Sequence, residues 1–247
     1  MENFQFLAKK SWYKQWWGAT IIVVVCIFFA FIIALALLTW RYHNLIKLGY
    51  EDELKRMIYG QTQQDEQNLA TRAELEITER PFLGNKEAEV VIVAFIDFNC
   101  PVCKEQNTIL QKVIGKYGNK IKLIWRNFPM ESLYKGSTRL SQMAYCSHEQ
   151  GLYWPAHNYF YDNQGNLPEN ITSVEMNNFT KEIGLDSKVF NACLLADKTK
   201  IESNRDFSIG YKYGVAGTPT FFLNGYRIPG NVPFEVWEDL IKKILNP

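Results

Sequence analysis

The sequence is poor in cysteine and histidine and has almost no net charge. Its 247 residues include five cysteines and three histidines, and the formal net charge is +1. Five cysteines are too few for a scaffold held together by disulfides. A net charge near zero favours neither nucleic acid nor an anionic surface as a partner. The sequence also lacks internal repeats and low-complexity tracts, and its 47% hydrophobic residues can supply a sizeable core.

The few cysteines and histidines do not form a metal-binding pattern. Among the cysteines, only Cys100 and Cys103 are closely spaced, in the motif Cys-Pro-Val-Cys. The other cysteines are single (Cys26, Cys146 and Cys193), and the histidines form no ligand pair (His43, His148 and His157). A structural zinc site needs four ligands, usually with a second close pair. We therefore predict no metal, with zinc ligation and two inert thiols as the alternatives to a redox-active pair.

One uncharged stretch, residues 18–40, is long enough to cross a membrane. At about 1.5 Å per residue a helix of this length spans roughly 34 Å, compared with about 30 Å for the hydrocarbon core of a bilayer. Tryptophans, whose rings favour the membrane interface, stand at both ends: Trp16, Trp17 and Trp40. We predict a transmembrane signal anchor over residues 18–40, preceded by a cytoplasmic tail over residues 1–17.

A cleaved signal peptide is the alternative for this stretch. Its apolar region would usually be only about 7–15 residues long, although Ala34-Leu35-Ala36 resembles a cleavage site. Basic residues lie on both sides of the stretch, so the positive-inside rule does not fix its orientation. Residues 41–79 are polar and rich in Glu, Gln, Lys and Arg. We interpret them as a stalk or linker that is helical in part, with a dimerising helix as the alternative.

The central feature of the remaining sequence is a predicted strand that leads directly toward Cys100. Residues 90–96 are continuously apolar and rich in β-branched residues, which indicates a strand buried on both faces. Residues 101–116 carry apolar residues at helical spacing, and Pro101 suits the first turn. Cys100 would then lie at a helix N-terminus. The free N–H groups and the helix dipole there stabilise a thiolate, which is the reactive species in disulfide exchange.

The other predicted elements complete an α/β fold that is interrupted by a helical segment. They are a strand over 120–126, helices over 133–150, 154–162, 174–183 and 187–213, a hairpin over 218–228 and a helix over 233–245. Asn224-Gly225 between two apolar runs is a strong hairpin signal, and Asp186 suits an N-cap. The first two strands and the helix between them form a right-handed parallel crossover. The helical segment, about 132–213, is an insertion.

Four segments resemble the DsbA-like thiol–disulfide oxidoreductases of the bacterial cell envelope. They are Phe95–Cys103, Arg126–Pro129, Glu149–Trp154 and Gly214–Thr220. The resemblance covers residues 80–247. It implies a thioredoxin-like α/β domain with an inserted helical domain, preceded here by the single N-terminal transmembrane helix.

The resemblance also implies the roles of several residues. Cys100 and Cys103 would be catalytic, with Pro101 and Val102 as the dipeptide between them. A cis peptide bond would precede Pro219, next to the cysteine pair. Because proline has no N–H, the backbone of Thr218 would remain free to pair with an extended substrate chain.

Two positions depart from the family pattern. Val102 stands where the strongest oxidants carry a histidine, and valine cannot donate a hydrogen bond to a thiolate. We therefore expect the pKa of Cys100 to lie below about 8.5, but to be depressed less than with histidine. Ala94 stands where relatives often carry a buried carboxylate that accepts a proton from the second cysteine. Asp97 is the candidate for proton handling here, or it only caps the loop.

Cys146 and Cys193 both lie in the helical insertion. Some relatives have a structural disulfide in this part of the fold, so the two could form one. The alternative is two small buried thiols, since free cysteine packs like a small hydrophobic residue.

The resemblance implies a membrane protein with one transmembrane helix and an extracytoplasmic catalytic domain. We expect it to introduce disulfides into secreted or envelope proteins that are reduced or misoxidised, by exchange through the Cys100–Cys103 pair. No cofactor is predicted, and re-oxidation implies a membrane quinone-linked thiol oxidase as partner. One alternative is a disulfide reductase or isomerase with the same site. The other is a non-redox peptide-binding or chaperone module that uses the Thr218–Pro219 edge.

Overall fold

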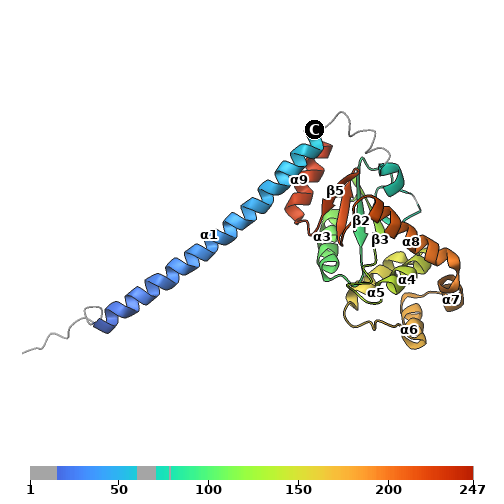
Figure 1. The fold of residues 1–247 in the computed structure, drawn as a ribbon. Coiled ribbons are helices and arrows are strands. Elements are labelled where there is room, and N and C mark those ends of the chain that lie inside the picture. The colour runs from blue at the N-terminus through green and yellow to red at the C-terminus, as the bar shows by residue number, and fades with distance from the viewer. Residues whose placement is uncertain (1–15, 60–70, 78, 247) are drawn as a thin grey trace, which may run out of the picture. The chain divides into compact units, whose positions relative to one another are not determined.

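The computed structural model describes residues 16–59, 71–77 and 79–246 (Figure 1). The chain divides into two units that are described separately, with the boundary between Arg56 and Met57. The predicted tail therefore lies outside the described residues except at its end, as does the part of the predicted stalk over residues 60–70.

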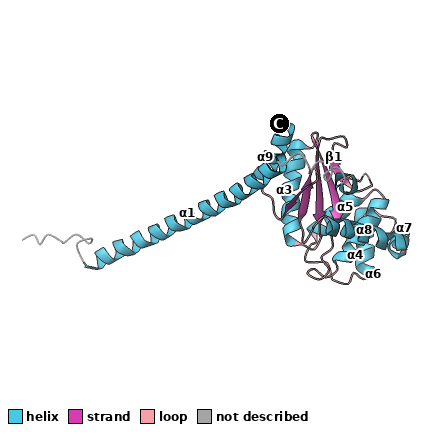
Figure 2. Ribbon diagram, turned by 45° about the horizontal axis from the view of Figure 1, so that its top comes forward, coloured by secondary structure: helices cyan, strands magenta, loops and turns pink. Residues whose placement is uncertain are grey.

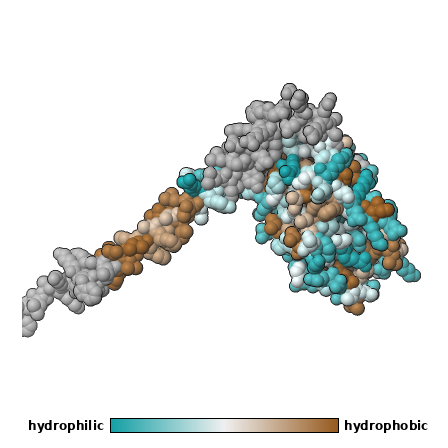
Figure 3. All heavy atoms as spheres, in the orientation of Figure 1, coloured by the Kyte–Doolittle hydropathy of each residue, from teal (hydrophilic) through white to brown (hydrophobic). Residues whose placement is uncertain are grey.

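The N-terminal unit contains one long helix, α1 (Trp16–Tyr59). Its segment Ile21–Asn44 is long and apolar enough to cross a membrane, by length and composition. Figure 3 shows much of α1 as hydrophobic surface. The helix continues through Gly49 to Tyr59, so the first part of the predicted stalk is helical.

The second unit contains a five-stranded sheet in the order β1-β3-β2-β4-β5. The strands are β1 (Phe82–Gly84), β2 (Val90–Ile96), β3 (Ile121–Asn127), β4 (Thr220–Leu223) and β5 (Tyr226–Pro229). The central strand β2 pairs parallel with β3 and antiparallel with β4. All seven residues of β2 are buried, as its continuous apolar sequence predicts. The predicted α/β thioredoxin-like fold is confirmed by this topology and by the comparisons reported below.

Helices cover both faces of the sheet (Figures 1 and 2). On one side lie α3 (Pro101–Tyr117) and α9 (Phe234–Leu245), where Trp237 of α9 packs edge-on against Phe221 of β4. On the other side lies α8 (Asp197–Lys212), which contacts β3. Because β2 has helices on both sides, its alternating side chains are all removed from water.

The helical insertion differs from the prediction at two points. Its elements are α4 (Ser137–Glu149), α5 (Tyr153–Asp162), α6 (Ser173–Ile183), α7 (Ser187–Leu195) and α8. The predicted helix over 187–213 is wrong, because Ala196 adopts an extended conformation and separates α7 from α8. The predicted start of a helix at residue 133 is also wrong. Gly136 has a φ of 84°, and α4 begins only after it.

Residues that precede the predicted domain start at residue 80 also pack against the core. Residues 71–75 are helical, and Leu75 is fully buried in a core cluster with Phe95 and Phe128. The Nη1 atom of Arg126 donates hydrogen bonds to the carbonyl groups of Glu74 and Leu75, at 2.8 and 3.2 Å. One buried leucine in a polar segment gives no periodic signal, so the sequence did not indicate this contact.

Candidate active site

The Cys-Pro-Val-Cys motif forms the start of α3, as predicted. Cys100 is the N-cap residue, with an extended backbone, and Pro101 follows in the first turn. The N–H groups of Cys103 and Lys104 both donate to the Cys100 carbonyl, at 3.1 and 3.3 Å. Both thiols are free, and each cysteine is only 1% exposed. Val102, in contrast, is 37% exposed and presents an apolar side chain beside the pair.

The loop before β4 lies against Cys100. The Cys100 Sγ atom lies 3.3 Å from the Thr218 carbonyl oxygen, to which the protonated thiol can donate a hydrogen bond. The peptide bond between Thr218 and Pro219 is cis. The Thr218 hydroxyl is buried without a hydrogen-bond partner among the described residues, and the Thr218 side chain lowers the pKa of Cys100. The structure thus brings together the two segments that the motifs had singled out separately.

The pKa values of the two thiols are shifted in opposite directions. The pKa of Cys100 is lowered to about 5, chiefly by hydrogen bonding from the Cys103 side chain. The Cys103 N–H and the side chains of Thr218 and Tyr134 lower it further, whereas burial raises it. Burial raises the pKa of the Cys103 thiol well above its ordinary value, and the adjacent Cys100 thiolate raises it further. At neutral pH the pair therefore holds one thiolate, on Cys100, and one thiol, on Cys103.

Asp97 is buried and organises the loop around the cysteine pair. Its Oδ1 accepts hydrogen bonds from the Asn99 N–H at 2.8 Å and from the Ser137 hydroxyl at 2.7 Å. Its Oδ2 accepts one from the Met130 N–H at 2.7 Å. Burial raises the pKa of the Asp97 carboxyl, although these three donors oppose the shift. The carboxylate therefore joins the ends of β2 and β3 to the start of α4.

Two residues of the site carried no signal in the sequence. The Tyr134 side chain, from the turn between β3 and α4, lowers the pKa of Cys100. The Nε2 atom of Gln164 donates to the carbonyl groups of Phe98 and Cys100, at 2.7 and 3.0 Å. Both interactions join segments that are far apart in the chain, and neither residue belongs to a motif that predicts such an interaction.

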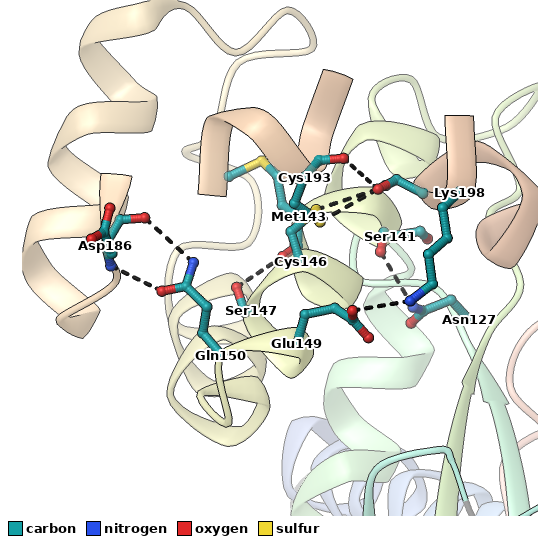
Figure 4. Close-up of a disulfide and its surroundings, with 11 residues drawn as sticks. Asn127, Ser141, Met143, Cys146, Ser147, Glu149, Gln150, Asp186, Cys193 and Lys198 are labelled. Atoms are coloured by element: carbon teal, nitrogen blue, oxygen red, sulfur yellow. Dashed lines mark hydrogen bonds and ion pairs between the residues drawn. A yellow bond between two sulfur atoms is a disulfide. The ribbon is translucent and has the colours of Figure 1, made fainter. Parts of the chain in front are cut away.

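Cys146 and Cys193 form a disulfide between α4 and α7 (Figure 4). The Thr199 hydroxyl lies close to both sulfur atoms, at 3.7 Å from Cys146 and 3.4 Å from Cys193. Gln150 also joins these helices, since its side chain exchanges two hydrogen bonds with the backbone of Asp186. The disulfide belongs to the helical insertion and is separate from the Cys100–Cys103 pair. Among the described residues, no cluster of three or more His, Cys, Asp or Glu side chains could hold a metal ion.

Several solved structures share this fold. A thioredoxin-like oxidoreductase from Silicibacter pomeroyi DSS-3 superposes with a TM-score of 0.62 at 23% identity, over 71% of this chain and 98% of that one. DsbA2 from Wolbachia pipientis gives 0.62 at 22% identity, over 74% and 98%. BdbD from Bacillus subtilis gives 0.61 at 20% identity, over 69% and 95%. The fold predicted from the DsbA-like motifs is therefore confirmed.

The chain also resembles part of several curated proteins. It is 26% identical over 152 residues to a Na⁺/H⁺ antiporter, NhaA 1, from Salinispora arenicola, and 25% identical over 147 residues to NhaA 3 from Salinispora tropica. These matches cover 62% and 60% of this chain, but the chain spans only 22% of the length of either antiporter. The family model described as Thioredoxin matches residues 76–243, well over half of the sequence. The chain therefore belongs to the thioredoxin family.

Proposed function

We propose that this protein is a membrane-anchored thiol–disulfide oxidoreductase that introduces disulfides into other proteins. The observation that carries the proposal is the free Cys100–Cys103 pair at the start of α3, with Cys100 Sγ beside the Thr218 carbonyl and the cis Pro219. The pKa of Cys100 is lowered to about 5, whereas burial raises the pKa of Cys103. Such a pair has one sulfur that leaves readily as a thiolate and one that stays protonated.

The reaction starts from the oxidised pair. A substrate thiolate attacks Cys100 Sγ, the Cys100–Cys103 bond breaks, and Cys103 takes up the electron pair and a proton. A second substrate thiolate then attacks the substrate sulfur of the mixed disulfide, and Cys100 leaves as a thiolate. The substrate loses two electrons and gains a disulfide, and the cysteine pair is reduced. Renewed turnover needs an oxidant, for which we propose a membrane quinone-linked thiol oxidase.

The acidity of Cys100 favours the oxidase direction. A thiol whose pKa lies below neutral pH is a thiolate at pH 7, and this stabilises the reduced protein relative to the disulfide. A reduced form that is stabilised in this way makes the disulfide a stronger oxidant. A reductase or isomerase, which uses the same residues, would need a less stable thiolate.

The surface around the Cys100 thiol is suited to binding an extended polypeptide. The Thr218 backbone lies beside Cys100, where an extended chain can pair with it. Val102 is 37% exposed, and Leu133, one residue before Tyr134, is 68% exposed. Apolar side chains such as these favour reduced, unfolded secreted or envelope proteins as substrates over small thiols.

We also propose the predicted topology in the membrane. Residues 18–40 would form a single-pass anchor after a cytoplasmic tail, and the thioredoxin domain would be extracytoplasmic. The candidate span Ile21–Asn44 supports the anchor. The Cys146–Cys193 disulfide supports the extracytoplasmic side, because disulfides persist mainly in oxidising compartments.

Transfer of a disulfide to a reduced, unfolded substrate protein tests the proposal directly. The oxidised full-length protein should form substrate disulfides stoichiometrically, and Cys100→Ser should abolish the reaction. Cys103→Ser, with Cys100 first converted to its mixed disulfide with glutathione, should exchange with a substrate that has a single thiol: glutathione leaves and a mixed disulfide between the substrate and Cys100 remains, which mass spectrometry can identify. Binding of the substrate without disulfide transfer, unchanged in Cys100→Ser, would mean that the protein is a non-redox peptide-binding module.

A further inference from the structure

A small polar cavity lies where β3 meets the helical insertion. Its volume is about 20 Å³, and residues of β3, α5 and α8 line it. Three of these residues are buried and carry polar atoms: Asn127 ends β3, Tyr153 begins α5, and Ser203 lies within α8. A cavity needs only about 10–15 Å³ to hold a water molecule, so there is room for one.

Each of these three side chains has a buried oxygen atom without a hydrogen-bond partner among the described residues: Asn127 Oδ1, Tyr153 Oη and Ser203 Oγ. The three residues are only 8%, 3% and 5% exposed. Asn127 donates from Nδ2 to the Ser141 carbonyl at 3.5 Å, which leaves its Oδ1 as an acceptor (Figure 4). Burial raises the pKa of Tyr153, so its hydroxyl keeps its proton at neutral pH. Because a buried polar atom without a partner is costly, three of them around one cavity indicate a polar ligand.

The carboxylates and the guanidinium group on the cavity wall are already paired. Arg80 donates to Asp206 at 2.8 Å and to Glu202 at 2.9 Å. Asp206 also accepts from Arg126 at 2.9 Å. Two guanidinium groups and two carboxylates cancel in formal charge, so this cluster offers no net charge to an ion. The ligand that fits is a small neutral molecule that both donates and accepts hydrogen bonds.

We propose that the cavity binds one water molecule, which bridges Asn127, Tyr153 and Ser203. The water donates to Asn127 Oδ1 and accepts from the Tyr153 hydroxyl, and the Ser203 hydroxyl is its third partner. Three hydrogen bonds are typical of a buried water. The partners belong to the sheet and to two helices of the insertion, so the water attaches the insertion to β3. This attachment is independent of the redox chemistry at the cysteine pair.

The sign of a stability change tests whether the cavity holds water. Ser203→Ala and Tyr153→Phe each remove one hydroxyl group. With the water present, each variant loses a hydrogen bond, and the unfolding equilibrium constant of the full-length protein in detergent should rise about fivefold. In a dry cavity the same substitutions would remove an unsatisfied polar group, and the constant would fall or stay unchanged. That result would overturn the proposal.

Two exposed residues of α8 provide matched controls. Ser208→Ala makes the same change as Ser203→Ala at an exposed position of the same helix, and it measures the gain in helix propensity alone. Tyr211→Phe is the control for Tyr153→Phe, because Tyr211 is 75% exposed. Neither control should raise the unfolding equilibrium constant. A rise in the controls as large as that in the cavity variants would overturn the proposal, because it could not come from the cavity.

A double variant and a crystal structure locate the water. One shared water couples the two hydroxyl groups, so Tyr153→Phe and Ser203→Ala together should raise the constant by less than the product of their separate effects. Effects that multiply would show that the hydroxyl groups have separate partners and would overturn the bridge. In a high-resolution crystal structure of the full-length protein, a single density peak should lie about 2.7–3.2 Å from all three oxygen atoms. A cavity without a peak, or a peak at the shorter distances typical of a bound cation, would overturn the proposal.

Discussion

The Sγ atom of Cys100 lies 3.3 Å from the carbonyl oxygen of Thr218, although 118 residues separate the two in the sequence. The sheet explains how they meet. Strands β2 and β4 pair antiparallel with Phe95 opposite Thr220, so the end of β2 and the start of β4 lie at the same edge. The reactive sulfur and the backbone proposed to bind substrate are therefore placed by one pair of adjacent strands in the core of the domain.

The first prediction concerns pH and the stability of the reduced protein. The pKa of Cys100 is about 5 in the folded protein and about 8.5 in an unfolded chain. The thiolate therefore contributes stability that is complete above about pH 8.5 and is lost as the pH falls through about 5. Thermal unfolding of the reduced protein and of Cys100→Ser should show a difference that shrinks over this range. A difference that does not depend on pH would contradict the low pKa.

The second prediction concerns Val102. Its side chain is partly exposed next to Cys100 and cannot donate a hydrogen bond. In Val102→His an imidazole donor should stabilise the thiolate further, and we expect the glutathione equilibrium to shift about tenfold, or about 30 mV, toward a more oxidising disulfide. Val102→Ala, which adds no donor, should leave the equilibrium within about twofold of the wild type. An equal shift in both variants would mean that the size of the side chain matters rather than hydrogen bonding.

The third prediction concerns Gln164, which donates to the carbonyl groups of Phe98 and Cys100. Gln164→Ala should leave these two acceptors without that donor and reduce the free energy of unfolding by about 1–3 kcal/mol. It should also change the alkylation rate of Cys100, because the backbone at the start of α3 loses support. Gln150→Ala removes two comparable hydrogen bonds to Asp186, far along the chain from the cysteine motif. This control should lose stability without a change in the reactivity of Cys100.

The fourth prediction concerns a buried cluster of charges between α8, β3 and Arg80. Asp206 Oδ1 accepts hydrogen bonds from Arg80 at 2.8 Å and from Arg126 at 2.9 Å, and all three residues are buried. Asp206→Ala would leave two guanidinium groups without this carboxylate, and the free energy of unfolding should fall by about 3–5 kcal/mol.

The exposed ion pair between Lys198 and Glu149 provides the control for this charge cluster. Lys198→Ala should change the free energy of unfolding by less than about 1 kcal/mol. Denaturant titration monitored by tryptophan fluorescence measures both variants. Equal effects of the two substitutions would show that the charges around Asp206 contribute no more than a surface pair.

Local signals predicted much of this fold. The apolar run of β2, the proline at the start of α3, the Asn224-Gly225 hairpin and the N-cap Asp186 each depend on neighbouring residues, and each is found where the sequence indicates. The three-residue strand β1 is too short for a detectable alternation. The break at Ala196 has no glycine or proline to mark it.

The site shows the same division between local and distant contacts. The position of the cysteine pair at a helix start was predictable, because strand, motif and helix are consecutive in the sequence. The positions of Tyr134 and Gln164 near Cys100 were not predictable, because they depend on the folding of the turn after β3 and of the helical insertion. For Asp97 the sequence left proton handling and loop capping open. Its three hydrogen bonds account for a capping role, and proton handling stays a prediction.

The reduction potential of the Cys100–Cys103 pair tests the central claim most directly. It can be measured by equilibrating the full-length protein with glutathione buffers and quantifying free and oxidised Cys100 and Cys103 by mass spectrometry. Because about 30 mV corresponds to a tenfold change in the equilibrium constant, the measurement separates the alternatives well. A potential well above that of the glutathione couple is the result we predict for a dithiol oxidase. A potential well below it would show that the protein works as a reductase and would contradict the proposed direction of electron flow.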